Sequence, residues 1–139
     1  MSLTVSRTNN QEAVMAMVRQ LQSRDATVRN HEAAHIGAGG GVITGGAHYS
    51  YQKGPDGRNY AIGGEVGIDS SPVSGNPQAT LSKMALVKAA ALAPSEPSAA
   101  DQSVAASATQ IEAQARVEAY RKGQQTSDSA RGTNVDLTV

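Results

Sequence analysis

The segment that decides the fold is N-H-E-A-A-H-I-G-A-G-G-G, residues 30–41, where a helical motif runs directly into a cluster of glycines. Ahead of it, apolar residues recur at intervals of three and four, which is typical of one face of a helix. The pattern predicts a long helix over residues 10–36, after a polar lead-in over residues 1–9. Ser23 could interrupt it by capping a second helix. The glycines that follow are expected to end the helix.

Short alternating segments downstream predict a small antiparallel sheet. Residues 47–52 alternate as in a strand, residues 54–57 (Gly-Pro-Asp-Gly) are a strong turn signal, and residues 60–62 return as the partner strand. Residues 63–64 (Gly-Gly) predict a bulge or a close approach of another part of the chain. Residues 65–69 extend the strand, so a hairpin with an extension is expected.

Two further helices are expected after the sheet. Asn76-Pro77 has the N-cap and first-turn proline that begin many helices. Ser98 can cap a last, alanine-rich helix that Gly123 is expected to end. The predicted fold class is therefore α+β, with a single domain over residues 1–123. Residues 124–139 are polar and are expected to form a flexible C-terminal tail.

The composition predicts a thin hydrophobic core. Alanine accounts for 23 of the 139 residues, Leu, Ile and Val together for another 23, and Phe and Trp are absent. That aliphatic share is below the roughly 20% at which compositions begin to resemble disordered chains, although high net charge is missing. Part of the chain is therefore expected to stay unpacked or to depend on a bound ion or partner.

Charge, hydropathy and cysteine content exclude several classes of protein. Twelve basic residues balance twelve acidic ones, which argues against a nucleic-acid binder. No apolar run approaches the roughly 18 residues of a membrane span, and the N-terminus lacks the apolar core of a secretory signal. We therefore expect a cytoplasmic location. Because the chain has no cysteine, any metal must be held by His, Asp or Glu.

His31-Glu32-Ala33-Ala34-His35 is an H-E-x-x-H motif, the zincin signature. Four residues span slightly more than one helical turn, so both imidazoles leave one face of the helix and can reach one zinc ion. Glu32 lies about 100° around the helix, where its carboxylate can take a proton from water activated by the metal. The motif predicts one zinc per chain, held by His31 and His35, with Glu32 as general base.

A third protein ligand is needed, and the sequence offers several candidates. Glu65 follows two glycines in an apolar strand, where an unpaired carboxylate would be costly to bury, and is the preferred ligand. It could also be a solvated strand residue. His48 is the alternative ligand, while Asp69 precedes Ser-Ser-Pro and is expected to cap a turn.

Two tyrosines and a glycine-rich segment complete the set of candidates. Tyr51 and Tyr60 could donate hydrogen bonds to a tetrahedral oxyanion, although packing of the hairpin against the helix is their more ordinary role. Residues 37–46 include six glycines, which could form a mobile flap over the site or a slack connection.

Four stretches of the chain resemble the SprA-related family of bacterial metalloproteases: residues 24–40 (R-D-A-T-V-R-N-H-E-A-A-H-I-G-A-G-G), 49–69, 76–80 and 89–102. The resemblance covers about residues 24–108 and includes Glu65. It implies a small zincin-like metalloprotease domain. His48 departs from the family, which usually has a small residue or proline there, and so adds a spare ligand candidate.

The expected function is zinc-dependent hydrolysis of peptide bonds in a peptide or protein substrate. The hairpin at residues 47–62 is expected beside the motif helix, where zincins bind substrate as an added strand. The alternative is a non-catalytic zinc-binding or interaction module, which the charge balance, thin core and alanine-rich last helix would also suit. Zinc content together with peptide cleavage separates the two.

Overall fold

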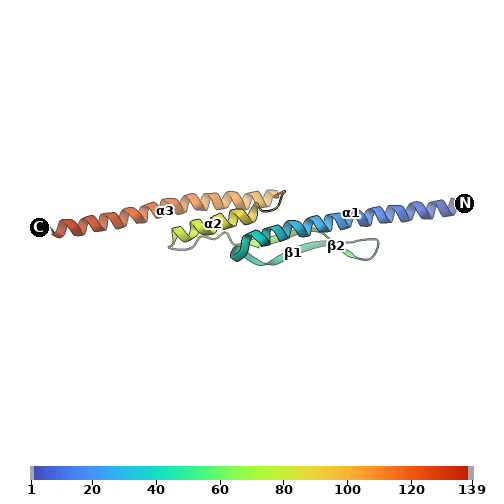
Figure 1. Ribbon diagram of the computed structural model, residues 1–139, viewed down its shortest axis with the longest axis horizontal. Helices are drawn as coiled ribbons and strands as arrows, with labels where there is room; N and C mark the ends of the chain where they lie inside the picture. The colour runs from blue at the N-terminus through green and yellow to red at the C-terminus, as the bar shows by residue number, and fades with distance from the viewer. Residues whose placement is uncertain (1, 138–139) are drawn as a thin grey trace.

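The computed structural model describes residues 2–137, with side chains described for residues 7–127. Six elements follow in order: α1 (Ser2–Gly39), the short 3-10 helix η1 (Gly40–Val42), β1 (Ile43–Lys53), β2 (Asn59–Ile68), α2 (Pro77–Ala91) and α3 (Ala99–Leu137). Figure 1 shows an elongated molecule with the two termini at opposite ends. The predicted α+β class is confirmed.

α1 is one continuous helix that begins earlier than the sequence predicted. The polar lead-in expected over residues 1–9 is wrong from Ser2 onward, because that stretch contains neither glycine nor proline to stop a helix. No break occurs at Ser23, whose carbonyl accepts a hydrogen bond from the Thr27 hydroxyl at 3.0 Å. The helix ends in the glycine cluster as expected, and Gly40 has a φ of 49°.

The strands form an antiparallel hairpin that contains the predicted turn. The Gly54 amide donates to the Arg58 carbonyl at 2.8 Å, and Gly57 adopts a positive φ of 81°. The register pairs His48 with Glu65. The register shifts at two places, between Thr44 and Ala47 on β1 and next to Ile62 on β2, and the second shift lies one residue before the predicted double glycine. The glycine-rich segment, residues 37–46, forms the end of α1, the short helix η1 and the start of β1.

Two side chains of α1 fasten β2 at the register shift next to Ile62. Arg24 Nε donates to the Ile62 carbonyl at 3.1 Å, and Asp25 Oδ1 accepts from the Ala61 amide at 2.8 Å. The hydrogen bond from Ala61, assisted by Arg29, holds the pKa of Asp25 below its usual range. Because both contacts lie within two helical turns of the H-E-x-x-H motif, they place β2 alongside it.

The hydrophobic core is small, as the composition predicted. Its buried members are Val42, Met84, Val87, Ala90 and Ala108, with Ile43, Ile68, Val104 and Ile111 packed against them half-buried. Asn76 caps α2 as expected, since its side-chain oxygen accepts from the Ala79 amide at 3.0 Å. The core thus joins α2 and α3 to η1 and the base of the hairpin, which follow the end of α1.

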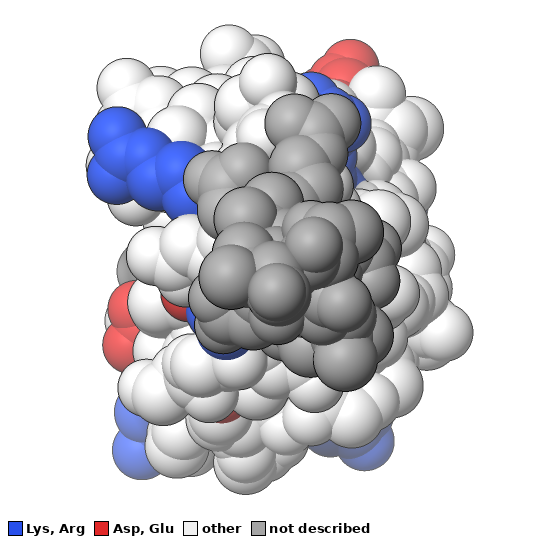
Figure 2. All heavy atoms as spheres, turned by 90° about the vertical axis from the view of Figure 1, so that its left-hand side faces the viewer, with Lys and Arg blue, Asp and Glu red and all other residues white. Residues whose placement is uncertain are grey.

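The C-terminal helix is longer than predicted. α3 continues through Gly123, its expected end, to Leu137, because one glycine lowers helix stability without stopping the helix. The flexible tail predicted over residues 124–139 lies mostly outside the described side chains. Figure 2 shows the molecule from this end, where Lys and Arg (blue) and Asp and Glu (red) lie scattered among uncharged side chains. Within the described residues, no helix combines the length and hydropathy needed to cross a membrane.

Candidate metal centre

Three potential ligand atoms meet where α1 passes the start of α3. His31 Nε2 lies 3.2 Å from His35 Nε2 and 3.0 Å from Asp101 Oδ2, and His35 Nε2 lies 3.3 Å from the same carboxylate oxygen. One helical turn separates the two histidines, as the motif requires, while Asp101 comes from the first turn of α3. Among the described residues, this His-His-Asp group is where metal-binding side chains converge.

The spacing of the three atoms fits a tetrahedral ion. Zinc binds nitrogen and oxygen at about 2.0–2.1 Å, so neighbouring ligands of a tetrahedral site lie about 3.3–3.4 Å apart. The three observed separations, 3.0 to 3.3 Å, are close to this ligand–ligand distance. Two imidazoles and one carboxylate are also a donor set that zinc accepts in proteins. The residues present therefore fit a zinc ion.

His35 is oriented for this role by a backbone contact. The residue is 2% exposed, and its Nδ1 lies 2.7 Å from the Ala90 carbonyl at the end of α2. A carbonyl oxygen can only accept, so Nδ1 carries the hydrogen and Nε2 of the neutral ring presents its lone pair. Such a bond fixes the tautomer and ring orientation of metal-binding histidines.

Asp101 is held by the N-terminal cap of α3. The Ser98 amide donates to Asp101 Oδ2 at 2.9 Å, and the Asp101 amide donates to the Ser98 hydroxyl at 3.0 Å, which together form a capping box. Burial opposes ionisation of Asp101, but the hydrogen bonds with Ser98 and the nearby His35 outweigh it and hold its pKa below the usual range. The carboxylate is therefore ready to bind a cation.

Glu32 is buried beside this group with one oxygen unused. The residue is 3% exposed, and its Oε2 has no hydrogen-bond partner among the described residues. Burial raises the pKa of Glu32, an effect that His31 and His35 oppose. A buried, unpartnered carboxylate oxygen costs free energy, so its retention points to a ligand or reactant at this place.

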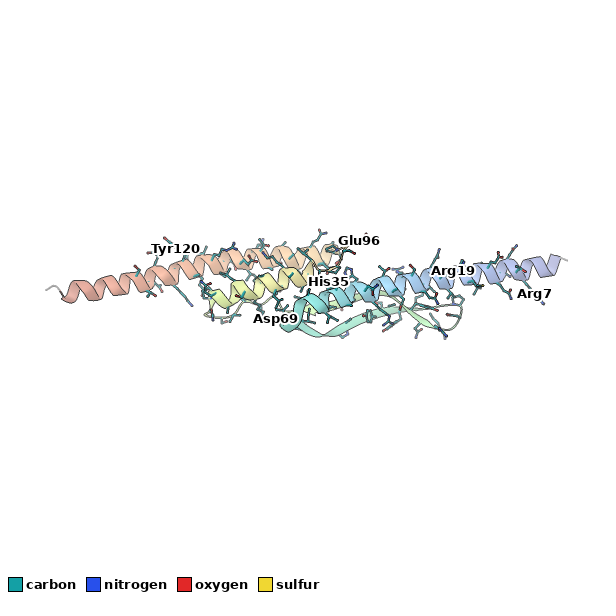
Figure 3. The ribbon with its side chains drawn as sticks, in the orientation of Figure 1. Arg7, Arg19, His35, Asp69, Glu96 and Tyr120 are labelled. Atoms are coloured by element: carbon teal, nitrogen blue, oxygen red, sulfur yellow. The ribbon has the colours of Figure 1, made fainter. Side chains whose placement is uncertain are left out.

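The pocket that contains these groups lies between α1, β2 and the start of α3. Its walls include the three potential ligands, Glu32 and the β2 residues 64–66. A side chain at Gly64 would contact Glu32, since an added Cβ would lie 3.0 Å from Glu32 Cγ. Gly64 therefore provides the close approach that the double glycine predicted. Figure 3 shows His35 in the middle of the molecule, where α1 passes α2.

The structure places the predicted third ligands outside the His-His-Asp group. Glu65 is exposed on β2 and lines the same pocket, whereas His48 is exposed on β1 directly opposite it. Neither belongs to the group that includes Asp101. Asp69 caps a turn as expected, because it accepts from the Ser71 amide at 3.0 Å, and it also pairs with Lys83.

The two tyrosines lie away from the pocket walls. Tyr60 is buried, and its hydroxyl donates to Asp56 Oδ2 in the hairpin turn at 2.5 Å. Tyr51 is 53% exposed on β1, with its ring centroid 6.2 Å from that of Tyr49. Neither tyrosine lines the pocket beside Glu32. Tyr60 is thus buried within the hairpin and bonded to its turn.

Asp101 is the site residue that the sequence analysis missed. The available signal was the pattern Ser98-Ala-Ala-Asp101, a capping box that puts a carboxylate in the first turn of a helix. The pattern gave no indication of what that helix end would face, because the meeting of α3 with α1 is set by the packing of both against α2.

Fold and site together define an α+β protein whose motif helix and C-terminal helix share a His-His-Asp group beside a buried glutamate. The sequence model of the SprA-related family matches residues 4–133, nearly the whole chain, and the protein belongs to that family. A search of curated proteins and a search of solved structures each found no significant match.

Proposed function

We propose that this protein is a zinc-dependent peptidase in which His31, His35 and Asp101 hold one metal ion and Glu32 is the general base. The observation that carries the proposal is Glu32, buried to 3% exposure with a free oxygen in the pocket that the three potential ligands line. Catalytic zinc sites have three protein ligands, whereas structural sites have four. Three donors meet in the part of the chain described.

The chemistry divides between the ion and the chain. A bound zinc ion supplies Lewis acidity, which polarises the scissile carbonyl and lowers the pKa of water in the site. Glu32 Oε2 accepts a proton from the attacking water as its oxygen bonds to the carbonyl carbon. Glu32 then returns that proton to the nitrogen as the C–N bond breaks. Burial makes the carboxylate a stronger base by raising its pKa.

In this proposal, β2 binds the substrate. Its residues 64–66 form one wall of the pocket, and Arg24 and Asp25 fix the strand against α1. Because strands recognise extended peptides through backbone hydrogen bonds, a substrate segment could pair along this strand with its scissile bond over the motif. The hairpin beside the motif helix would then provide the strand to which the substrate pairs.

One experiment separates this function from a non-catalytic zinc module. The purified chain, reconstituted with zinc, is incubated with a diverse peptide mixture, and new termini are identified by mass spectrometry. We expect cleavage that is lost on chelation and that Glu32→Gln slows by about 10²–10⁴-fold while zinc content is unchanged.

Glu12→Gln is the matched control, since Glu12 is an exposed glutamate on the same helix, and it should cleave as the parent does. Wild-type turnover in Glu32→Gln would contradict the assigned role. A protein that binds zinc, gains thermal stability from it and cuts no peptide would be the structural module. In that case the metal would stabilise the fold, because its ligands come from two helices, α1 and α3, and the ion would hold them together.

A further inference from the structure

The candidate site continues past His31 into a second hollow. One pocket lies on the β2 side and contains Glu32 and Glu65, and the other lies on the side of the link between α2 and α3 and contains Glu96. His31 and Thr27 line both pockets, so the two adjoin along this face of α1, and we call them together the cleft. Figure 3 shows Glu96 on that link, close to the middle of the molecule.

The two pockets carry unpaired negative charge. Glu65 and Glu96 are both exposed, and within the described side chains neither forms a salt bridge. No Lys or Arg is among the described residues that line either pocket. The basic residues on this part of α1 are used elsewhere, since Arg24 binds the Ile62 carbonyl and Arg29 pairs with Asp25.

The local charge contrasts with that of the chain as a whole. The protein has no net charge, yet four carboxylates line the cleft: Glu32, Glu65, Glu96 and Asp101. A divalent ion would offset two of the four charges. The unpartnered, buried oxygen of Glu32 is a separate indication that the cleft binds a ligand. A concave surface of one sign concentrates ligands of the opposite sign and repels those of the same sign.

We propose that the cleft selects basic peptides, with Glu65 binding a Lys or Arg side chain on one side of the scissile bond and Glu96 binding one on the other side. This proposal rests on the proposed function, because it treats the metal group as the point of cleavage. Both glutamates act as specificity determinants and neither takes part in bond cleavage. Peptides with acidic residues at the same positions are repelled.

The test is cleavage of peptides that differ only in the residues flanking the cut. The parent should prefer Lys or Arg over Gln at these positions and reject Glu. Glu65→Gln should reduce the preference on one side of the bond by about 2–5-fold, and Glu96→Gln should do so on the other side. Higher salt should weaken both preferences, since exposed charges are screened.

Matched controls keep the result specific. Glu12→Gln removes the same charge far from the cleft and should leave both preferences intact. Zinc content of each variant is measured, and it should stay at one per chain. Cleavage without any charge preference, or equal preferences in the parent and both variants, would overturn the proposal while leaving the peptidase function standing.

A binding measurement distinguishes failure of this proposal from failure of the proposed function. The zinc-loaded Glu32→Gln protein is titrated with a fluorescent basic peptide and with its acidic counterpart, and anisotropy is recorded. Tighter binding of the basic peptide, weakened by the Glu65 and Glu96 substitutions, supports the charge selection even if the parent cuts nothing. Equal binding of the two peptides contradicts it.

Discussion

The two halves of α1 show opposite relations between polarity and burial. Towards its N-terminus, the apolar Val14 and Met17 are 44% and 52% exposed, whereas the polar Glu32 and His35 near its C-terminus are 3% and 2% exposed. The difference arises because only the second half is covered, by the hairpin, α2 and the start of α3. Within one helix, burial therefore follows what packs against it and not the hydropathy of the residue.

The two buried polar residues, Glu32 and His35, differ in whether their polar atoms are hydrogen-bonded. Burying a polar group costs free energy unless it is bonded, and His35 meets that condition through Ala90. Glu32 leaves one oxygen unbonded. A protein with so small a core has little stability to offset such a cost, which is why we propose a functional role for the covered half of α1.

The largest expected effect is on zinc binding, when a proposed metal ligand in the covered half of α1 is replaced. His35→Ala should abolish stoichiometric zinc binding, a loss beyond the roughly 10–100-fold that changes outside the ligand set cause. Val14→Ala, in the uncovered half of the same helix, should bind zinc as the parent does because its side chain is exposed. Elemental analysis and a chelator competition measure both, and full zinc content in His35→Ala would contradict the site.

A smaller effect is expected at the close approach between β2 and Glu32. In Gly64→Ala the new Cβ would lie 3.0 Å from Glu32 Cγ and 3.2 Å from its Oε1, so the carboxylate must shift. A shift of a few tenths of an ångström relieves these contacts, so turnover should fall by less than the roughly 100-fold that a displacement of about 1 Å can cause, about 3–10-fold. Zinc binding should persist, because Glu32 is not a ligand.

The neighbouring glycine provides the control for this change. An added Cβ at Gly63 meets nothing within 4 Å, so Gly63→Ala should cleave at nearly the parent rate. Steady-state kinetics on any substrate found by the peptide screen compares the two variants. Equal activity in both would show that the approach of β2 does not position Glu32.

An effect of similar size is expected at the cap of α3. Ser98→Ala removes the hydroxyl that bonds the Asp101 amide, which should weaken zinc binding by about 10-fold and lower the free energy of unfolding by about 1 kcal/mol. Ser103→Ala, an exposed serine in the same helix, is the control. Reduced stability with unchanged zinc affinity would show that the cap does not orient a ligand.

Local signals in the sequence predicted most of the elements. Asn76 and Ser98 cap their helices, and the Gly-Pro-Asp-Gly turn forms as expected, because these features depend on neighbouring residues alone. The predicted start of α1 and the predicted end of α3 were wrong for a related reason. Segments rich in polar residues give no apolar period of three and four in the sequence, yet they continue a helix when no strong helix breaker intervenes.

The sequence predicted only those residues of the candidate site that lie on the motif helix α1. His31, Glu32 and His35 share a motif whose spacing fixes their geometry, so the sequence could place them together. Asp101 lies 66 positions beyond His35 and reaches it through the packing of three helices. Glu65 lies in the same pocket without joining the group, which shows that a strand can bring a carboxylate near a site without making it a ligand.

The most direct test of the account is zinc titration of two near-isosteric variants, Asp101→Asn and Glu65→Gln. Asn keeps an acceptor for the Ser98 amide, so the capping box survives while the anionic ligand is lost. The account predicts that Asp101→Asn loses stoichiometric zinc and that Glu65→Gln binds one zinc per chain with the parent's affinity. Loss of zinc in Glu65→Gln together with full binding in Asp101→Asn would contradict it.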